Sequence, residues 1–153
     1  MLGRVRRTLD ALSGTAVSSK SVAGSSLLLH LGRSGSSQPS TTVWLDPGWR
    51  YERRGCAVVG SGDFPVVEDE SDKPAFDRVC RLLDDLHGMM LQSAEVSLPS
   101  YDLSLSFAGD RRILGFALTV VDLDWPNWQL HDLAGGVRYN ITTQGISVEP
   151  EVN

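Results

Sequence analysis

Two stretches of this sequence carry the same helical pattern, 74 positions apart. Residues 76–88 read FDRVCRLLDDLHG, and their apolar side chains recur at the spacing of one helix face. Residues 2–14 read LGRVRRTLDALSG and match them in register, with Gly14 and Gly88 at the two ends. Glycine is the usual residue where a helix ends in a left-handed conformation. The match predicts two copies of one unit, each opened by a short helix.

Each predicted helix is followed by strand-like segments with turn residues between them. Tyr101–Phe107 alternates apolar and polar residues, which is typical of a strand with one buried face. Ile113–Leu123 is apolar on both sides, so we expect a central strand covered on both faces. The other predicted strands are Thr15–Val22, Leu27–Leu31, Thr41–Leu45, Trp49–Glu52, Cys56–Gly60, Met89–Ser97, Val137–Ile141 and Gly145–Val148. The predicted fold is α+β: a duplicated helix–β-meander unit, with antiparallel sheets and two short helices packed on one face.

The predicted organisation is a single domain, residues 1–153, built from two repeats. Repeat one spans residues 1–63, repeat two spans 74–148, and an acidic connector, 64–73, joins them. Neither repeat is large enough to bury a core alone, which favours one joint core. Residues 1–38 are basic and rich in serine, as organellar transit peptides are. The match between the two helices argues that residues 1–14 are retained rather than processed.

Charge is distributed unevenly along the chain. The net charge is −5, with eight Lys and Arg against three Asp and Glu in residues 1–56, and six against sixteen in residues 57–153. One interpretation is that the two halves attract each other within one fold; the other is an acidic face for a basic partner. The overall sign disfavours nucleic acid. No apolar run is long enough to span a membrane.

The sequence carries no catalytic, phosphate-binding or metal-binding motif, so we expect no enzyme activity and no cofactor. Asp122, Asp124 and Asp132 lie near His131, but their spacing fits solvent-facing strand positions better than a metal site. The two cysteines, Cys56 and Cys80, are far enough apart for a disulfide bridge. The apolar helix face favours a buried free thiol at Cys80. Low cysteine use fits a reducing compartment, and we expect a cytoplasmic protein.

The four tryptophans divide into two pairs. Trp49 and Trp128 each anchor an alternating strand, and we expect equivalent core positions for them. Trp125 precedes Pro126 at a predicted loop tip, where an aromatic side chain is hard to bury. Exposed aromatic residues are common anchors in protein interfaces. Trp125, Trp44, Asp122, Asp124 and Asp132 are therefore the predicted contacts for a protein partner.

Arg50, Arg53 and Arg54 form a small basic group beside Trp49. Such a group can bind a phosphate or a carboxylate. It is more often a solvated edge strand protected by charge.

Three segments resemble small bacterial proteins of unknown function found in actinobacterial genomes near toxin–immunity genes. They are Leu83-Asp84-Asp85-Leu86-His87-Gly88, Leu103-Ser104-Leu105-Ser106-Phe107 and Trp128-Gln129-Leu130. The resemblance implies an α+β fold and transfers no catalytic residue.

Three functional hypotheses follow from the sequence. The first is a non-enzymatic protein-binding module, an immunity-like protein that neutralises a basic toxin partner. The second is a structural subunit, in which sheets pair edge to edge into a homodimer or a larger assembly. The third is a small-ligand-binding or enzymatic domain, with a pocket between the repeats near Arg50, Tyr51 and His131.

Overall fold

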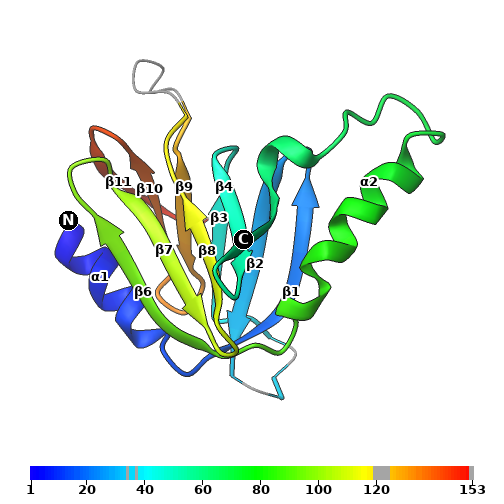
Figure 1. Ribbon diagram of the computed structural model, residues 1–153. Helices are drawn as coiled ribbons and strands as arrows, with labels where there is room; N and C mark the ends of the chain where they lie inside the picture. The colour runs from blue at the N-terminus through cyan, green and yellow to red at the C-terminus, as the bar shows by residue number, and fades with distance from the viewer. Residues whose placement is uncertain (34, 37, 119–124, 152–153) are drawn as a thin grey trace.

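The computed structural model describes residues 1–33, 35–36, 38–118 and 125–151, and within them two antiparallel sheets and two short α-helices (Figure 1). The helices are α1 (Leu2–Ala11) and α2 (Lys73–Cys80), with 3₁₀ turns η1 (Ser61–Asp63) and η2 (Arg81–Leu86). In spatial order, the first sheet contains β1 (Ala16–Ala23), β2 (Ser26–Gly32), β3 (Thr41–Leu45), β9 (Trp128–Asp132), β10 (Val137–Thr142) and β11 (Gly145–Pro150). The second contains β5 (Cys56–Gly60), β4 (Trp49–Arg53), β8 (Arg111–Gly115), β7 (Asp102–Phe107) and β6 (Leu91–Ser97). The predicted α+β class is confirmed.

The two halves of the chain exchange strands between the sheets. After β3 the chain crosses to the second sheet, where β4 pairs with β8; after β8 it crosses back, and β9 pairs with β3. At the first crossing Gly48 has φ +113°, and a Cβ there would lie 2.2 Å from the Phe116 carbonyl oxygen, so this corner requires glycine. Buried residues from both halves accordingly form one core.

Reciprocal hydrogen bonds join the two halves where each first strand begins. Gly14 donates to the Leu91 carbonyl at 2.8 Å, and Gly88, its counterpart, donates to the Val17 carbonyl at 2.8 Å. Leu91 donates to Thr15 at 2.8 Å and Val17 to Met89 at 3.0 Å, again as counterparts. Both glycines have positive φ, as predicted for helix C-termini. These contacts have the pattern of a local twofold axis and support the predicted repeats, although the duplication itself stays a prediction.

Trp49 and Trp128 occupy corresponding core positions, as expected. Each side chain is 1% exposed. The indole of Trp49 donates to the Ser25 carbonyl at 2.7 Å, and that of Trp128 donates to the Tyr101 carbonyl at 2.8 Å. Each accepting carbonyl lies in the turn that joins the first two strands of its half, so the two indoles fix equivalent turns.

The longest predicted strand, Ile113–Leu123, is shorter than expected in its described part, and its residues 119–123 lie outside the described residues. β8 is central in its sheet but ends at Gly115, and of its residues only Ile113 and Gly115 are buried. The prediction that it is covered on both faces is wrong, because one face of this antiparallel sheet packs on the core and the other meets solvent. Leu45 fills the space beside Gly115, where a Cβ would lie 2.8 Å from its Cδ2 atom.

The helices lie at opposite ends of the pair of sheets (Figure 1). α1 packs along β6, whereas the main contact of α2 is with η2, which continues it. No helix in the described parts of the chain is long and apolar enough to cross a membrane.

Candidate protein-binding site

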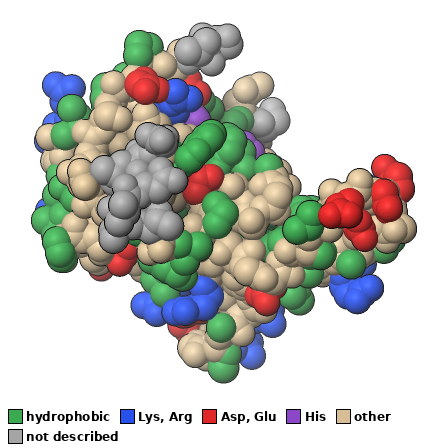
Figure 2. All heavy atoms as spheres, turned by 90° about the horizontal axis from the view of Figure 1, so that it is seen from above, with side chains coloured by type: hydrophobic (Ala, Val, Ile, Leu, Met, Phe, Trp, Pro, Cys, Tyr) green, Lys and Arg blue, Asp and Glu red, His purple; other side chains and the backbone are tan. Residues whose placement is uncertain are grey.

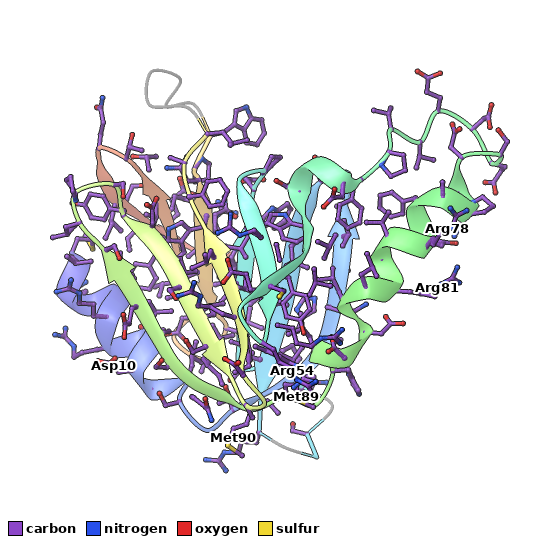
Figure 3. All side chains as sticks on the ribbon, in the orientation of Figure 1. Asp10, Arg54, Arg78, Arg81, Met89 and Met90 are labelled. Carbon is purple, nitrogen blue, oxygen red and sulfur yellow. The ribbon has the colours of Figure 1, made fainter. Side chains whose placement is uncertain are left out.

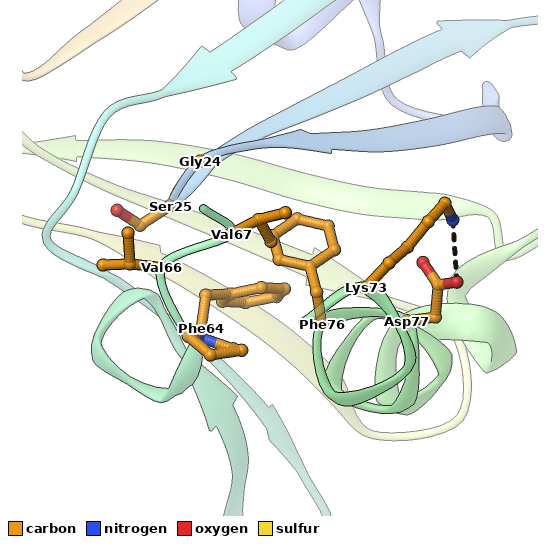
Figure 4. A pocket seen from close by; sticks show the side chains of 9 residues that line it. Gly24, Ser25, Phe64, Val66, Val67, Lys73, Phe76 and Asp77 are labelled. Atoms are coloured by element: carbon orange, nitrogen blue, oxygen red, sulfur yellow. Dashed lines mark hydrogen bonds and ion pairs between the residues drawn. The ribbon is translucent and has the colours of Figure 1, made fainter. Parts of the chain in front are cut away.

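A hollow of about 540 Å³ lies between α2 and the main body of the protein. Its walls are the turn Gly24–Ser25 between β1 and β2, the connector segment Phe64–Val67, and the inner face of α2 with Phe76 (Figure 4). We refer to it as the α2 hollow. Its three walls are remote from one another in the sequence, and the fold brings them together.

Aromatic packing forms the inner side of the α2 hollow. The rings of Phe64 and Phe76 meet edge to face with centroids 5.4 Å apart, and Phe64 also packs on the buried Trp49 at 5.8 Å. This chain of rings couples the connector to both the core and α2. Val66 and Val67, which follow, are 78% and 47% exposed. The hollow therefore presents apolar surface to solvent.

Negative charge gathers beside the α2 hollow, in the turn Glu68–Asp72 that we call the acidic rim; of the described residues that line the hollow itself, Asp77 is the acidic one. Residues 64–77 contain five acidic side chains and a single basic one, Lys73. Lys73 is paired with Asp77 at 2.8 Å, so its charge is already compensated. Figure 2 shows acidic side chains at the end of the arm formed by α2 and the connector. An apolar hollow with an acidic rim suits an apolar side chain flanked by cations.

The acidic run is a folded turn, not an extended tail. The Asp72 carboxylate accepts hydrogen bonds from the Glu68 and Asp69 backbone amides, at 3.0 and 3.3 Å. The Asp69 carboxylate accepts from the Ser71 hydroxyl and backbone amide, and these hydrogen bonds lower the pKa of Asp69. The acidic groups are thus held together at the start of α2, where negative charge also favours the helix.

η2 positions α2 through the Asp85 carboxylate. This group accepts hydrogen bonds from Tyr51 Oη at 2.9 Å, Arg53 Nη1 at 2.8 Å and Arg111 Nε at 3.1 Å. Burial alone would raise the pKa of Asp85, but the hydrogen bonds from Arg53, Tyr51 and Arg111 together hold it below its ordinary value. Burial and the bond to Asp85 raise the pKa of Tyr51 to about 12. The contacts anchor η2 to β4 and β8.

Two of the predicted partner contacts lie on the outer face of the first sheet. Trp125 is 75% exposed and lines a shallow hollow with Gln129, Arg138 and Asn140. Trp44 is directly paired with Gln129 across β3 and β9. Its ring is half-buried and stacks on His131, with centroids 6.3 Å apart. The structure thus places Trp44 and Trp125 around one glutamine, at a site separate from the α2 hollow.

Asp132, the one predicted acidic contact within the described residues, does not lie beside Trp125. Asp132 lies at the opposite end of β9, where its Oδ1 accepts a hydrogen bond from the Gly135 amide at 2.8 Å and closes a turn. Asp122 and Asp124 lie outside the described residues. The structure therefore supports Trp125 as an exposed aromatic residue and assigns Asp132 a local structural role.

The basic group has separate environments. Arg50 pairs with Glu52 at 2.9 Å, and Arg53 pairs with Asp85 at 2.8 Å. Arg54 lies in the turn between β4 and β5 with φ +53°. The charges are paired along a solvated strand, but β4 lies between β5 and β8, so the prediction of an edge strand is wrong.

The structure does not bring together the residues near which a pocket between the repeats was predicted, Arg50, Tyr51 and His131. Tyr51 is fully buried in the second sheet, whereas His131 lies in the first, bonded to Glu151 and Gln129. No group of three or more His, Cys, Asp or Glu suited to a metal ion occurs in the part of the chain that the structure describes. Cys56 is exposed, Cys80 is half-buried, and both are free thiols.

Sequence reasoning identified the acidic connector but missed the apolar walls of the α2 hollow. The available signal was Phe64-Pro65-Val66-Val67, an apolar run directly before the acidic one. Comparison of the chain with protein-family models, curated proteins and solved structures found no match. The resemblance to proteins near toxin–immunity genes stays a prediction.

Proposed function

We propose that this protein is a non-enzymatic binding module that recognises a basic segment of a protein partner, as an immunity-like protein neutralising a basic toxin would. The observation that carries the proposal is the α2 hollow, whose apolar walls are followed in the chain by the acidic rim. Burial of an apolar side chain there supplies affinity, and the rim attracts and orients the flanking cations. A cytoplasmic location belongs to the same proposal and is supported by the two free thiols.

Co-expression with the product of an adjacent gene tests this proposal. Cells that make the basic partner should survive only when this protein is present, and the two proteins should co-elute in gel filtration. Normal survival of cells that make the partner without this protein would remove the immunity-like role.

A pair of charge reversals tests the acidic rim. Glu68→Lys with Glu70→Lys changes two exposed rim residues, and we expect partner association to slow by about tenfold at low salt and less at high salt. Asp10→Lys with Glu95→Lys is the matched control, because it makes the same charge change beside α1. Equal effects of the two pairs would show that only net charge matters.

The homo-oligomer alternative has weaker support at the β11 edge of the first sheet. β11 is the outermost strand of its sheet, but it carries Glu149 and Pro150, which oppose pairing with another edge. Light scattering at micromolar concentration separates the two proposals, since the binding module is expected to be a monomer before it meets its partner.

A further inference from the structure

The outer edges of β1 and β6 are equivalent in the two halves but differ in how they are covered. The carbonyl of Val96, on β6, accepts a hydrogen bond from Arg6 Nη2 of α1 at 3.4 Å. In the match between the halves, Val22 on β1 corresponds to Val96, and Cys80 corresponds to Arg6. A cysteine at this position has no guanidinium with which to reach the strand. The edge of β1 therefore lacks the donor that covers β6.

The geometry of the β1–β2 hairpin directs the backbone of Val22 toward this edge. Ala23 and Ser26 are partners across the Gly24–Ser25 turn, where Gly24 has φ +62°. The partners that flank a two-residue turn bond to each other, so in the antiparallel alternation the next residue, Val22, points its amide and carbonyl away from β2. Among the described residues, no hydrogen bond to these groups from outside the hairpin is found.

The α2 hollow opens at the end of this strand edge. Gly24 and Ser25 form one of its walls, and α2 forms another without burying any of its own residues. Below Val22, Lys20 Nζ bonds to Asp84 Oδ1 at 2.8 Å and joins β1 to η2. The stretch of edge between this ion pair and the turn is about four residues long, ~13 Å in an extended strand, and it runs from Lys20 to the wall of the hollow.

Cys80 faces this edge. It is the last residue of α2 and lies four positions before Asp84, whose carboxylate bonds to Lys20 of β1 at 2.8 Å. Arg78 and Arg81, its neighbours in sequence, point away from the sheets (Figure 3). A residue at position 80 therefore has access to the edge that its neighbours lack.

We propose that the partner segment binds in an extended conformation, pairing with the β1 edge at Val22 and placing one apolar side chain in the α2 hollow. This inference rests on the proposed function and specifies the ligand: a short, basic, strand-forming segment, not a helix. Strand addition obtains affinity from backbone hydrogen bonds and specificity from pockets for alternate side chains. The acidic rim, with no uncompensated cation in residues 64–77, complements the basic flanks of such a segment.

The probe is a displayed library of random peptides. Each peptide has about ten residues and is ~33 Å long when extended. Peptides selected on the full chain should be rich in Lys and Arg and should contain one apolar residue. The positions on either side of that apolar residue should not be proline. Synthetic copies, methylated at one backbone nitrogen at a time, should lose affinity at alternate positions by about tenfold, as expected for one lost backbone hydrogen bond. Loss without alternation would overturn strand addition.

The second experiment introduces beside β1 a guanidinium donor like that of Arg6 beside β6. Cys80→Arg should cover the Val22 carbonyl and weaken the selected peptides by about tenfold. Leu82→Arg adds the same charge at an exposed site two positions away and should change affinity less than about twofold. Thermal unfolding verifies that both variants are folded.

The outcomes separate the two proposals. If basic peptides bind but Cys80→Arg and methylation at alternate positions leave binding unchanged, strand addition is wrong and the binding function stands. If no basic peptide binds the folded protein, both are wrong.

Discussion

The first and second helices occupy equivalent places in the two halves, yet only the first buries side chains within its α-helical part. α1 is continuous over ten residues, buries Val5 and Leu9, and packs along β6. The second changes at Arg81 from the α-helix α2, which buries none of its residues, to the 3₁₀ turn η2, which buries Leu83 and Leu86. The first helix is thus packed on the body of the protein along its length, whereas of the second helix only the η2 part buries side chains.

The difference arises from residues upstream of a shared core. Leu9 in α1 and Leu12, which directly follows this helix, correspond to Leu83 and Leu86 in η2, and all four are buried. In a 3₁₀ turn residues three apart lie on one side, so η2 keeps this pair inward. Before the pair the helices diverge: the ring of Phe76 packs on Phe64 of the connector instead of on a strand. The shared residues maintain the fold, and the divergent ones form the hollow.

Core truncations should have the largest effects and test whether the two helices share a core. Leu9→Ala and Leu83→Ala should each lower the free energy of unfolding by about 3 kcal/mol, because both side chains are buried. Phe76→Ala should cost only about 1–2 kcal/mol, since its ring is half-buried at the hollow. Urea denaturation measures all three. A cost at Phe76 equal to that at Leu83 would mean that α2 belongs to the core after all.

Removal of the Asp85 anchor should have the next largest effect. Asp85→Ala leaves Tyr51, Arg53 and Arg111 without their shared acceptor and should cost about 2 kcal/mol. Asp84→Asn is the control, because the Asp84 carboxylate is 63% exposed and its pair with Lys20 is worth less than about 1 kcal/mol. Similar losses in the two variants would contradict a special role for Asp85.

Acid should weaken this anchor in a defined pH range. The folded-state pKa of Asp85 lies below the ordinary 3.8, so the folded protein holds its proton less readily than the unfolded chain. Its contribution is complete above pH 3.8 and is lost as the pH falls through the folded value. Ala11, its counterpart in α1, does not titrate. Asp85→Ala should therefore reduce the loss of stability on acidification.

Local patterns in the sequence were sufficient to predict most helices and strands of this fold. The apolar spacing around Leu83, the glycine at position 88 and the alternation in Tyr101–Phe107 each depend on neighbouring residues only. Burial of Trp49 and Trp128 followed from the same alternation. For these reasons the α+β class, the approximate limits of most strands and the two core tryptophans could be predicted.

Long-range features could not be predicted in the same way. The exchange of strands depends on how the corner at Gly48 turns toward Phe116, which no local pattern records. The α2 hollow depends on residues 24–25, 64–67 and 73–77 coming together in space. The second helix changes from α-helix to a 3₁₀ turn at Arg81, and the hydrogen bonds that hold Asp85 of this turn come from two other strands. The candidate site was therefore predicted only through its charge.

Glycine substitutions at matched arginines should have the smallest effect and compare the two helices most directly. Arg4 and Arg78 are counterparts, both exposed and both within α-helix. Arg4→Gly should cost about 1 kcal/mol, the usual penalty for glycine in a helix interior. Arg78→Gly should cost less than about half of that, because a helix with no buried residue can unfold locally without loss of the core.

Hydrogen exchange supplies the independent measurement for this pair. Amides of α2 should exchange faster than those of α1 in the unchanged protein, and Arg78→Gly should accelerate α2 while leaving α1 as it was. In the presence of a peptide that occupies the α2 hollow, α2 should become protected, because its apolar face then has a partner. Equal protection of α1 and α2 in the free protein would show that the second helix packs as stably as the first. The β1 edge would then be covered, and strand addition would be wrong.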